Sequence, residues 1–134
     1  MKFILPLCLA SCLVTAACGN RAVEVDHPFY LTSIEDSGDI ALFRCPDGPK
    51  HGCAVDGLPG PRVLRAGANK RYVVVAQQPL SDAERRTAYY YFARVPEESG
   101  AYGMNPEKII GPIDESQFQR AKASLDLPEF SVEP

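Results

Sequence analysis

The sequence predicts a small α+β domain, in which an antiparallel β-sheet meander of five to six strands is followed by one C-terminal amphipathic helix. Short runs of strand-forming residues alternate with clusters of Gly, Pro, Asn and Asp from residue 29 to residue 95, and the one segment with helical periodicity follows them. A chain of 134 residues has room for a single hydrophobic core. We therefore expect residues 28–134 to form one globular domain.

The first two strands are expected at residues 29–34 and 39–45, both rich in aromatic and β-branched or aliphatic side chains. The sequence Glu-Asp-Ser-Gly at 35–38 between them has the composition of a tight hairpin turn. Residues 46–52 contain two prolines and two glycines and are expected to form a loop, after which the chain returns at 53–55.

Further strands are expected after a second break, Gly-Leu-Pro-Gly-Pro at 57–61. They lie at residues 62–64, 70–76 and 88–95. The second of these contains three consecutive valines, which is typical of a central strand buried on both faces.

A single helix is expected near the C-terminus. Asp114 and Gln117 have the spacing of a capping box, which satisfies backbone donors at the start of a helix. Phe118, Ala121 and Leu125 follow at i, i+3 and i+7 on one face, and Pro128 is expected to stop the helix.

The N-terminal segment has the pattern of a secretory signal peptide. Lys2 gives a positive start, and the segment from Phe3 to Ala17 carries no charge and ends in small residues. This stretch of about 15 residues is shorter than the roughly 20 apolar residues that a transmembrane helix requires. We therefore assign residues 1–17 to a cleaved signal peptide.

Residues 14–18, Val-Thr-Ala-Ala-Cys, resemble the lipobox of bacterial lipoproteins, which implies that Cys18 becomes the acylated first residue of the mature chain, carrying diacylglycerol and acyl groups such as palmitate. Residues 9–12, Leu-Ala-Ser-Cys, offer a second match with Cys12 as the acylated residue. Cleavage before Cys12 would leave a signal of only 11 residues and an apolar tail on the mature protein, so Cys18 is preferred.

The resemblance also implies a location in the cell envelope. Residues 18–27 are expected to form the lipidated N-terminus and a short tether that keeps the domain close to a membrane. In such lipoproteins an Asp after the acylated cysteine favours retention in the inner membrane, and this chain has Gly19 instead. The outer membrane, with the domain facing the periplasm, is therefore favoured.

The second half of the chain resembles a family of small uncharacterised bacterial lipoproteins. The resemblance comprises a Tyr-rich strand at residues 89–92, a turn formed by Gly111, Pro112 and Ile113, and a short helix containing Phe118. It implies a meander that leads into a helix, and it brings no activity.

The five cysteines are consistent with export. Cys8 and Cys12 leave with the signal peptide and Cys18 is used by the lipid, so Cys45 and Cys53 remain as one pair. Because thiols pair in oxidising compartments, we expect a Cys45–Cys53 disulfide that closes the loop between them.

A metal site is the alternative use of these cysteines. Cys45, His51 and Cys53 lie within nine residues and are ligand types that zinc accepts, with His27 as a possible fourth ligand. Their spacing lacks the usual C-x₂₋₄-C knuckle, so the disulfide is favoured and neither a metal nor a cofactor is expected.

Composition and motifs argue against nucleic-acid binding and against catalysis. A formal net charge of −3 gives no basic excess for nucleic acid. Only His27 and His51 are available as imidazole bases, and no nucleophile elbow, phosphate-binding loop or metalloprotease helix is present. Two acidic pairs remain as candidates for a small envelope hydrolase: Glu97 with Glu98, and Asp114 with Glu115.

The remaining hypothesis is a non-catalytic binding module. Lys50 and His51 lie in the predicted disulfide loop, and Tyr90 and Phe92 are expected on one face of an aromatic strand, so these four residues are the candidate contact surface for another envelope protein. We expect an interaction protein, for example of the inhibitor or immunity type, rather than an enzyme; the small hydrolase is the alternative.

Overall fold

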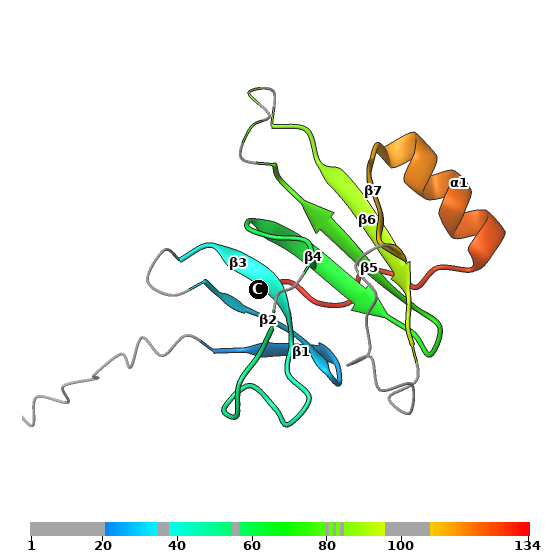
Figure 1. The fold of residues 1–134 in the computed structure, drawn as a ribbon. Coiled ribbons are helices and arrows are strands. Elements are labelled where there is room, and N and C mark those ends of the chain that lie inside the picture. Colours follow the sequence, from blue (N-terminus) through cyan, green and yellow to red (C-terminus); the bar gives the residue numbers. More distant parts are fainter. Residues whose placement is uncertain are drawn as a thin grey trace, which may run out of the picture.

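The computed structural model describes residues 21–34, 38–54, 57–79, 81, 83, 85–95 and 108–134, and confirms the α+β class. Seven antiparallel strands and one helix are present in these residues. They form two sheets, with orders β1-β2-β3 and β4-β5-β6-β7, rather than the single sheet of five to six strands that was expected (Figure 1).

The first sheet consists of β1 (Val23–Asp26), β2 (Phe29–Ser33) and β3 (Ile40–Arg44). The strands at 29–34 and 39–45 are thus confirmed, while residues 53–55 contribute only an isolated bridge between Ala54 and Arg44. Strand β1 pairs with β2 through Val23↔Leu31, so this part of the expected tether belongs to the sheet. The assignments of residues 1–17 and 18–20 lie outside the described residues.

The second sheet consists of β4 (Val63–Ala68), β5 (Tyr72–Gln77), β6 (Ala88–Ala93) and β7 (Ile110–Ile113). The valine-rich strand β5 is central, as its composition predicted, and all three valines are fully buried. Strand β7 occupies the Gly-Pro-Ile segment that was expected to be a turn.

Helix α1 (Glu115–Leu125) begins with the predicted capping box. The Asp114 carboxylate accepts from the Gln117 backbone N–H at 2.7 Å, and the Gln117 side chain accepts from the Asp114 N–H at 3.0 Å. Phe118 is the buried residue of its inner face. The helix ends at Asp126 in the left-handed conformation, two residues before the proline that was expected to stop it.

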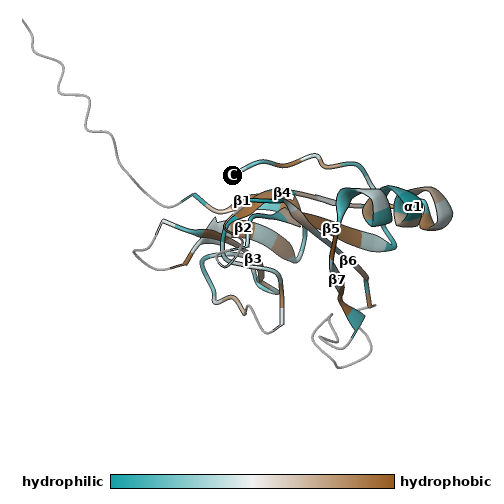
Figure 2. Cartoon of the chain, turned by 90° about the horizontal axis from the view of Figure 1, so that it is seen from above, coloured by the Kyte–Doolittle hydropathy of each residue, from teal (hydrophilic) through white to brown (hydrophobic). Residues whose placement is uncertain are grey.

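The elements form three layers, with two apolar interfaces. Between the sheets, side chains of β2 and β3 meet those of β4, β5 and β6: Phe29, Leu31, Leu42, Val63, Ala66, Val73, Val75 and Phe92. On the opposite face of the second sheet, Tyr89 and Val74 pack against Phe118 of α1 and Leu127. In Figure 2, most of β5 has the colour of hydrophobic residues, consistent with the burial of this strand on both faces.

The C-terminal segment returns along the edge strand β4. Val132 and Ala66 exchange two backbone hydrogen bonds of 2.9 and 3.0 Å. A Cβ atom on Gly67 would lie 2.0 Å from the Glu129 carbonyl oxygen, so only glycine allows this close passage. Phe130 completes an aromatic stack with Phe118, at a centroid distance of 5.5 Å.

Candidate functional site

The face of the first sheet that points away from the second sheet is the candidate site, and we call it the outer face. Phe29, Leu31 and Leu42 point into the core between the sheets. Because side chains alternate along a strand, their neighbours occupy the other side. These neighbours are Glu24 on β1, Tyr30 and Thr32 on β2, and Ala41 and Phe43 on β3.

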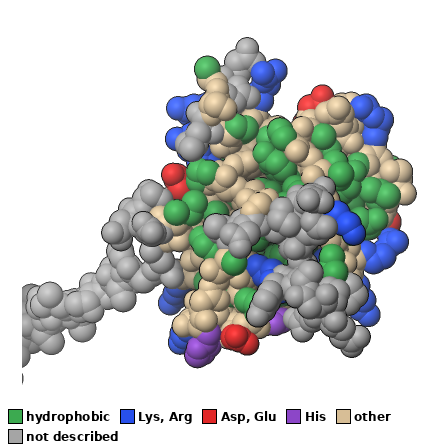
Figure 3. Space-filling view, in the orientation of Figure 1, with side chains coloured by type: hydrophobic (Ala, Val, Ile, Leu, Met, Phe, Trp, Pro, Cys, Tyr) green, Lys and Arg blue, Asp and Glu red, His purple; other side chains and the backbone are tan. Residues whose placement is uncertain are grey.

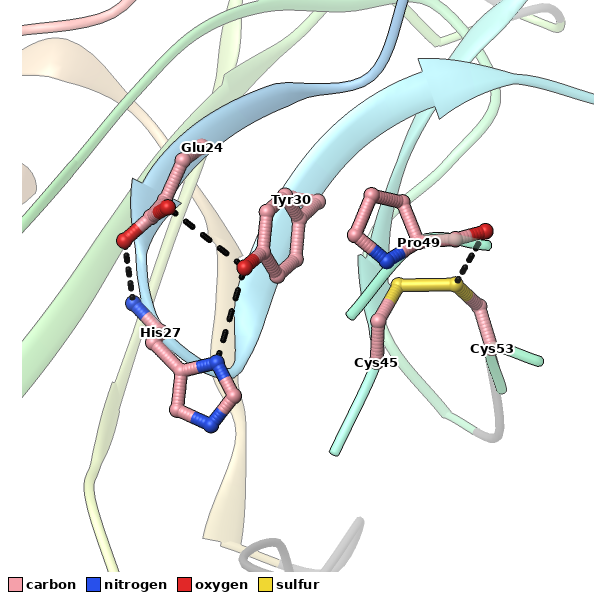
Figure 4. The surroundings of a disulfide bond; sticks show 6 residues. All are labelled: Glu24, His27, Tyr30, Cys45, Pro49 and Cys53. Carbon is pink, nitrogen blue, oxygen red and sulfur yellow. Dashed lines mark hydrogen bonds between the residues drawn. A yellow bond between two sulfur atoms is a disulfide. The ribbon is translucent and has the colours of Figure 1, made fainter. Parts of the chain in front are cut away.

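The expected disulfide joins Cys45 to Cys53 next to this face, with the two Cα atoms 4.3 Å apart (Figure 4). Cys45 is fully buried, whereas Cys53 is exposed. The base of the loop is also closed by two backbone hydrogen bonds of 2.8 Å between Arg44 and Ala54. A further bond of 2.7 Å from the Cys45 N–H to the Pro28 carbonyl fixes the loop to the β1–β2 turn.

Lys50 and His51 are both exposed in the disulfide-closed loop, as expected. In the space-filling view, the histidine side chains lie near an acidic one at the end of the molecule that carries the loops of the first sheet (Figure 3). The loop therefore presents polar and titratable groups on a backbone that is fixed at its base.

The expectation that Phe92 belongs to the contact surface is wrong. Phe92 is 1% exposed and packs on Phe29 between the sheets, with a ring-centroid distance of 5.5 Å. Tyr90 points to the same side of β6, is half-buried against this core, and has its phenol pKa raised by burial. Because the first sheet covers this part of β6, Phe92 does not join Lys50 and His51 in an exposed patch.

A polar cluster on the outer face was not anticipated. The Tyr30 hydroxyl donates to the Glu24 carboxylate at 3.4 Å and lies 3.5 Å from Nδ1 of His27 (Figure 4). Burial raises the pKa of Tyr30, and the negative charge of Glu24 and its hydrogen bond raise it further. Little in the sequence indicates this cluster. Glu24 comes six residues before Tyr30, and the pairing of the unexpected strand β1 with β2 brings them together.

A pocket of about 460 Å³ opens on the first sheet next to this cluster. Most of its wall is apolar, and it is formed by β2, β3, the disulfide and the loop that leads to β4. The lining residues are Thr32, Ser33, Ile34, Ala41, Phe43, Cys53, Leu58, Gly60 and Pro61. Its volume lies within the range of small-molecule sites, roughly 300–1,000 Å³. The sequence analysis did not find it, because its walls come from four separate segments of the chain.

Several of the residues considered as metal ligands or as catalytic acids have structural roles. The sulfurs of Cys45 and Cys53 are bonded to each other, and the described residues contain no group of three or more His, Cys, Asp or Glu side chains that could hold a metal ion. Asp114 caps α1, and Glu115 lies in its first turn. Glu97 and Glu98 lie outside the described residues.

No protein family matches the sequence, and comparisons with curated proteins and with solved structures find no match. In the part of the chain that the structure describes, no helix is long and apolar enough to cross a membrane.

Proposed function

We propose that this protein is a lipid-anchored component of the bacterial cell envelope and that it acts as a non-catalytic module that binds another envelope protein. The observation that carries the binding role is the disulfide-closed loop, which exposes Lys50 and His51 on a backbone held at both ends. A loop that is already ordered loses less conformational entropy when it binds.

The proposed anchor rests on the leader and on the cysteine count. Besides the paired Cys45 and Cys53, the sequence contains Cys8, Cys12 and Cys18, all within the first 18 residues. Acylation of Cys18 after removal of the leader would leave no free thiol in an oxidising compartment. An anchor of this kind also raises the local concentration of the domain near its partners at the membrane.

The partner class that we propose is an envelope enzyme whose activity the module restrains, as an inhibitor or an immunity-type protein does. Gly19 after the acylated cysteine favours the outer membrane, with the domain facing the periplasm. In that position the loop would meet proteins that share the same compartment.

The anchor is tested by the intact mass of the mature protein. We expect a chain that begins at Cys18 and carries lipid, and we expect Cys18→Ser to lose both the lipid mass and membrane fractionation. Cys12→Ser is the matched control and should leave both unchanged. A Cys18→Ser protein that keeps the same acyl mass would move the acylation site to Cys12.

The binding role is tested by affinity capture of envelope proteins with the lipidated protein and two variants. We expect one partner that binds the wild type, is lost with Lys50→Ala/His51→Ala, and is retained by Lys70→Ala, which removes an equally exposed cation from the β4–β5 turn. Hydrolysis of a glycan or ester panel that disappears with His51→Ala, with no such partner, would instead favour the small envelope hydrolase.

A further inference from the structure

The pocket on the outer face lies beside the point at which the chain enters the first sheet. Val23, the first residue of β1, pairs with Leu31, and the next residues of β2, Thr32 and Ser33, line the pocket. Since β1 and β2 are antiparallel, the start of β1 lies at the same end of the sheet as these residues. In Figure 1 the start of β1 and the end of β2 lie on the same side of the sheet.

The length of the preceding chain limits how far an anchor lies from the pocket. Four residues lie between Cys18 and Val23, so the two positions are five steps apart along the chain. At up to about 3.5 Å per step, they are no more than about 18 Å apart. An acyl chain attached at Cys18 is therefore long enough to reach the pocket wall.

The chemistry of the wall fits an acyl chain. Ala41 and Phe43 form the floor on β3, and Leu58 and Pro61 add aliphatic surface from the loop before β4. These groups offer dispersion contacts, and the polar side chains of the lining are the two hydroxyls of Thr32 and Ser33. The lining therefore carries no charge to compensate a charged ligand for its lost hydration. An acyl chain replaces water against the apolar wall and requires no polar partner.

We propose that this pocket holds one acyl chain of the lipid carried by Cys18, an inference that rests on the lipid anchor proposed above. A bilayer shields the methylene groups of the acyl chain from water as well as the pocket does. The preference for the pocket therefore comes from the apolar protein surface that the acyl chain covers. The short tether supports it further, because the effective concentration of a group on a short linker is in the millimolar range.

The test is nuclear magnetic resonance of the full mature protein in a fully deuterated detergent. Because the deuterated detergent gives no proton signal, the signals of long acyl chains come from the anchor of the protein itself. We expect nuclear Overhauser effects between acyl methylene protons and the methyl groups of Ala41 and Leu58, and none to Ala121 on α1. Cys18→Ser in the same detergent should lose them.

Two substitutions make the test specific to the pocket. Thr32→Phe adds a ring to the lining of the pocket and should abolish the effects, whereas Gln119→Phe places the same ring on the exposed side of α1 and should preserve them. If Thr32→Phe does not fold, Thr32→Ile, which keeps strand propensity, replaces it.

The outcomes separate this inference from the anchor itself. A lipidated protein without these effects would overturn the acyl site and leave the anchor intact. A mature protein without lipid mass would overturn both. Effects that appear in Cys18→Ser only after undeuterated phospholipid is added, and never from the anchor, would show that the pocket takes lipid from the bilayer, which contradicts the proposal.

Discussion

Arg94 joins three separate segments. Its guanidinium pairs with Asp26, donates to the His27 carbonyl at 2.8 Å, and donates to the Asn69 carbonyl at 2.8 Å. It also lies over the Phe29 ring, 5.8 Å from the centroid. The side chain is 19% exposed, so these contacts are largely shielded from water. One residue that follows β6 therefore connects the second sheet to the β1–β2 turn.

Arg94→Ala is expected to lower the free energy of unfolding by about 2–3 kcal/mol, because two backbone acceptors and a carboxylate lose a charged donor. The ion pair with the half-exposed Asp26 contributes the smaller part. Urea unfolding measures the change, with Arg120→Ala as the control, since Arg120 is exposed and donates to Ser116 on its own helix. Equal midpoints for the two variants would contradict the connecting role.

At the scale of elements, the loop between Cys45 and Cys53 is closed twice, once by the disulfide and once by the Arg44 and Ala54 hydrogen bonds. The disulfide acts mainly on the unfolded chain, where it restricts a loop with a sequence separation of 8. The backbone bonds act in the folded state. Loss of the disulfide should therefore lower the free energy of unfolding without opening the loop in the folded state.

Cys45→Ala/Cys53→Ala is expected to reduce the free energy of unfolding by about 2–3 kcal/mol, as the loop-entropy relation gives for so short a loop. Denaturant unfolding gives this value, and hydrogen exchange at the Arg44 and Ala54 amides reports the loop base. Those amides should remain protected in the double variant. Rapid exchange there would show that the disulfide alone holds the loop.

The C-terminal segment and β4 depend on each other at Gly67. Gly67→Ala would place a methyl group 2.0 Å from the Glu129 oxygen, so the segment must move away from the sheet edge. We expect a loss of about 1–3 kcal/mol, as for an overpacked core position. Limited proteolysis near the C-terminus should become faster. An unchanged cleavage rate together with unchanged stability would contradict this contact.

At the scale of the whole molecule, the sequence predicted which segments form most of the strands but not how the strands divide between layers. Alternation and turn residues locate β2, β3, β5 and β6, and the capping box locates α1. Strand β7 was missed because its sequence, Ile-Gly-Pro-Ile, contains the two residues that are poorest in strands. Strand β1 was missed because it has only four residues before a proline turn.

The division into two sheets also explains why Phe92 was wrongly expected to belong to a contact surface. A strand pattern shows that Tyr90 and Phe92 share one face, but it does not show what covers that face. The disulfide was predictable because Cys45 and Cys53 are the two cysteines of the sequence beyond residue 18 and lie close together along the chain. The pocket and the Glu24–His27–Tyr30 cluster depend on contacts between segments that no local pattern contains.

Phe92 tests the contact between the two sheets. Phe92→Ala should cost about 3–5 kcal/mol, the usual range for a large side chain removed from a core. Because the ring contacts Phe29 across the layers, we expect both sheets to unfold together in thermal melts that are followed by far- and near-ultraviolet circular dichroism. Lys50→Ala, in the exposed loop, should change stability by less than about 0.5 kcal/mol. Similar values for the two variants would contradict the layered core.

Stability at alkaline pH depends on two phenols in different parts of the molecule. The pKa values of both phenols are raised above the usual value for tyrosine in the folded protein. Burial raises the pKa of Tyr30, and the charge of Glu24 and its hydrogen bond raise it further. Burial raises the pKa of Tyr90. The folded state therefore favours the protonated phenols. This contribution to stability is fully present below about pH 10, the pKa of an unfolded tyrosine, and is lost as the pH rises through the folded-state pKa values.

Tyrosinate absorbance should show that a fraction of the phenols ionises at a higher pH than an unfolded tyrosine does. Tyr30→Phe and Tyr90→Phe should each reduce that fraction and flatten the alkaline loss of stability, whereas a titration curve unchanged by both substitutions would contradict the assignment.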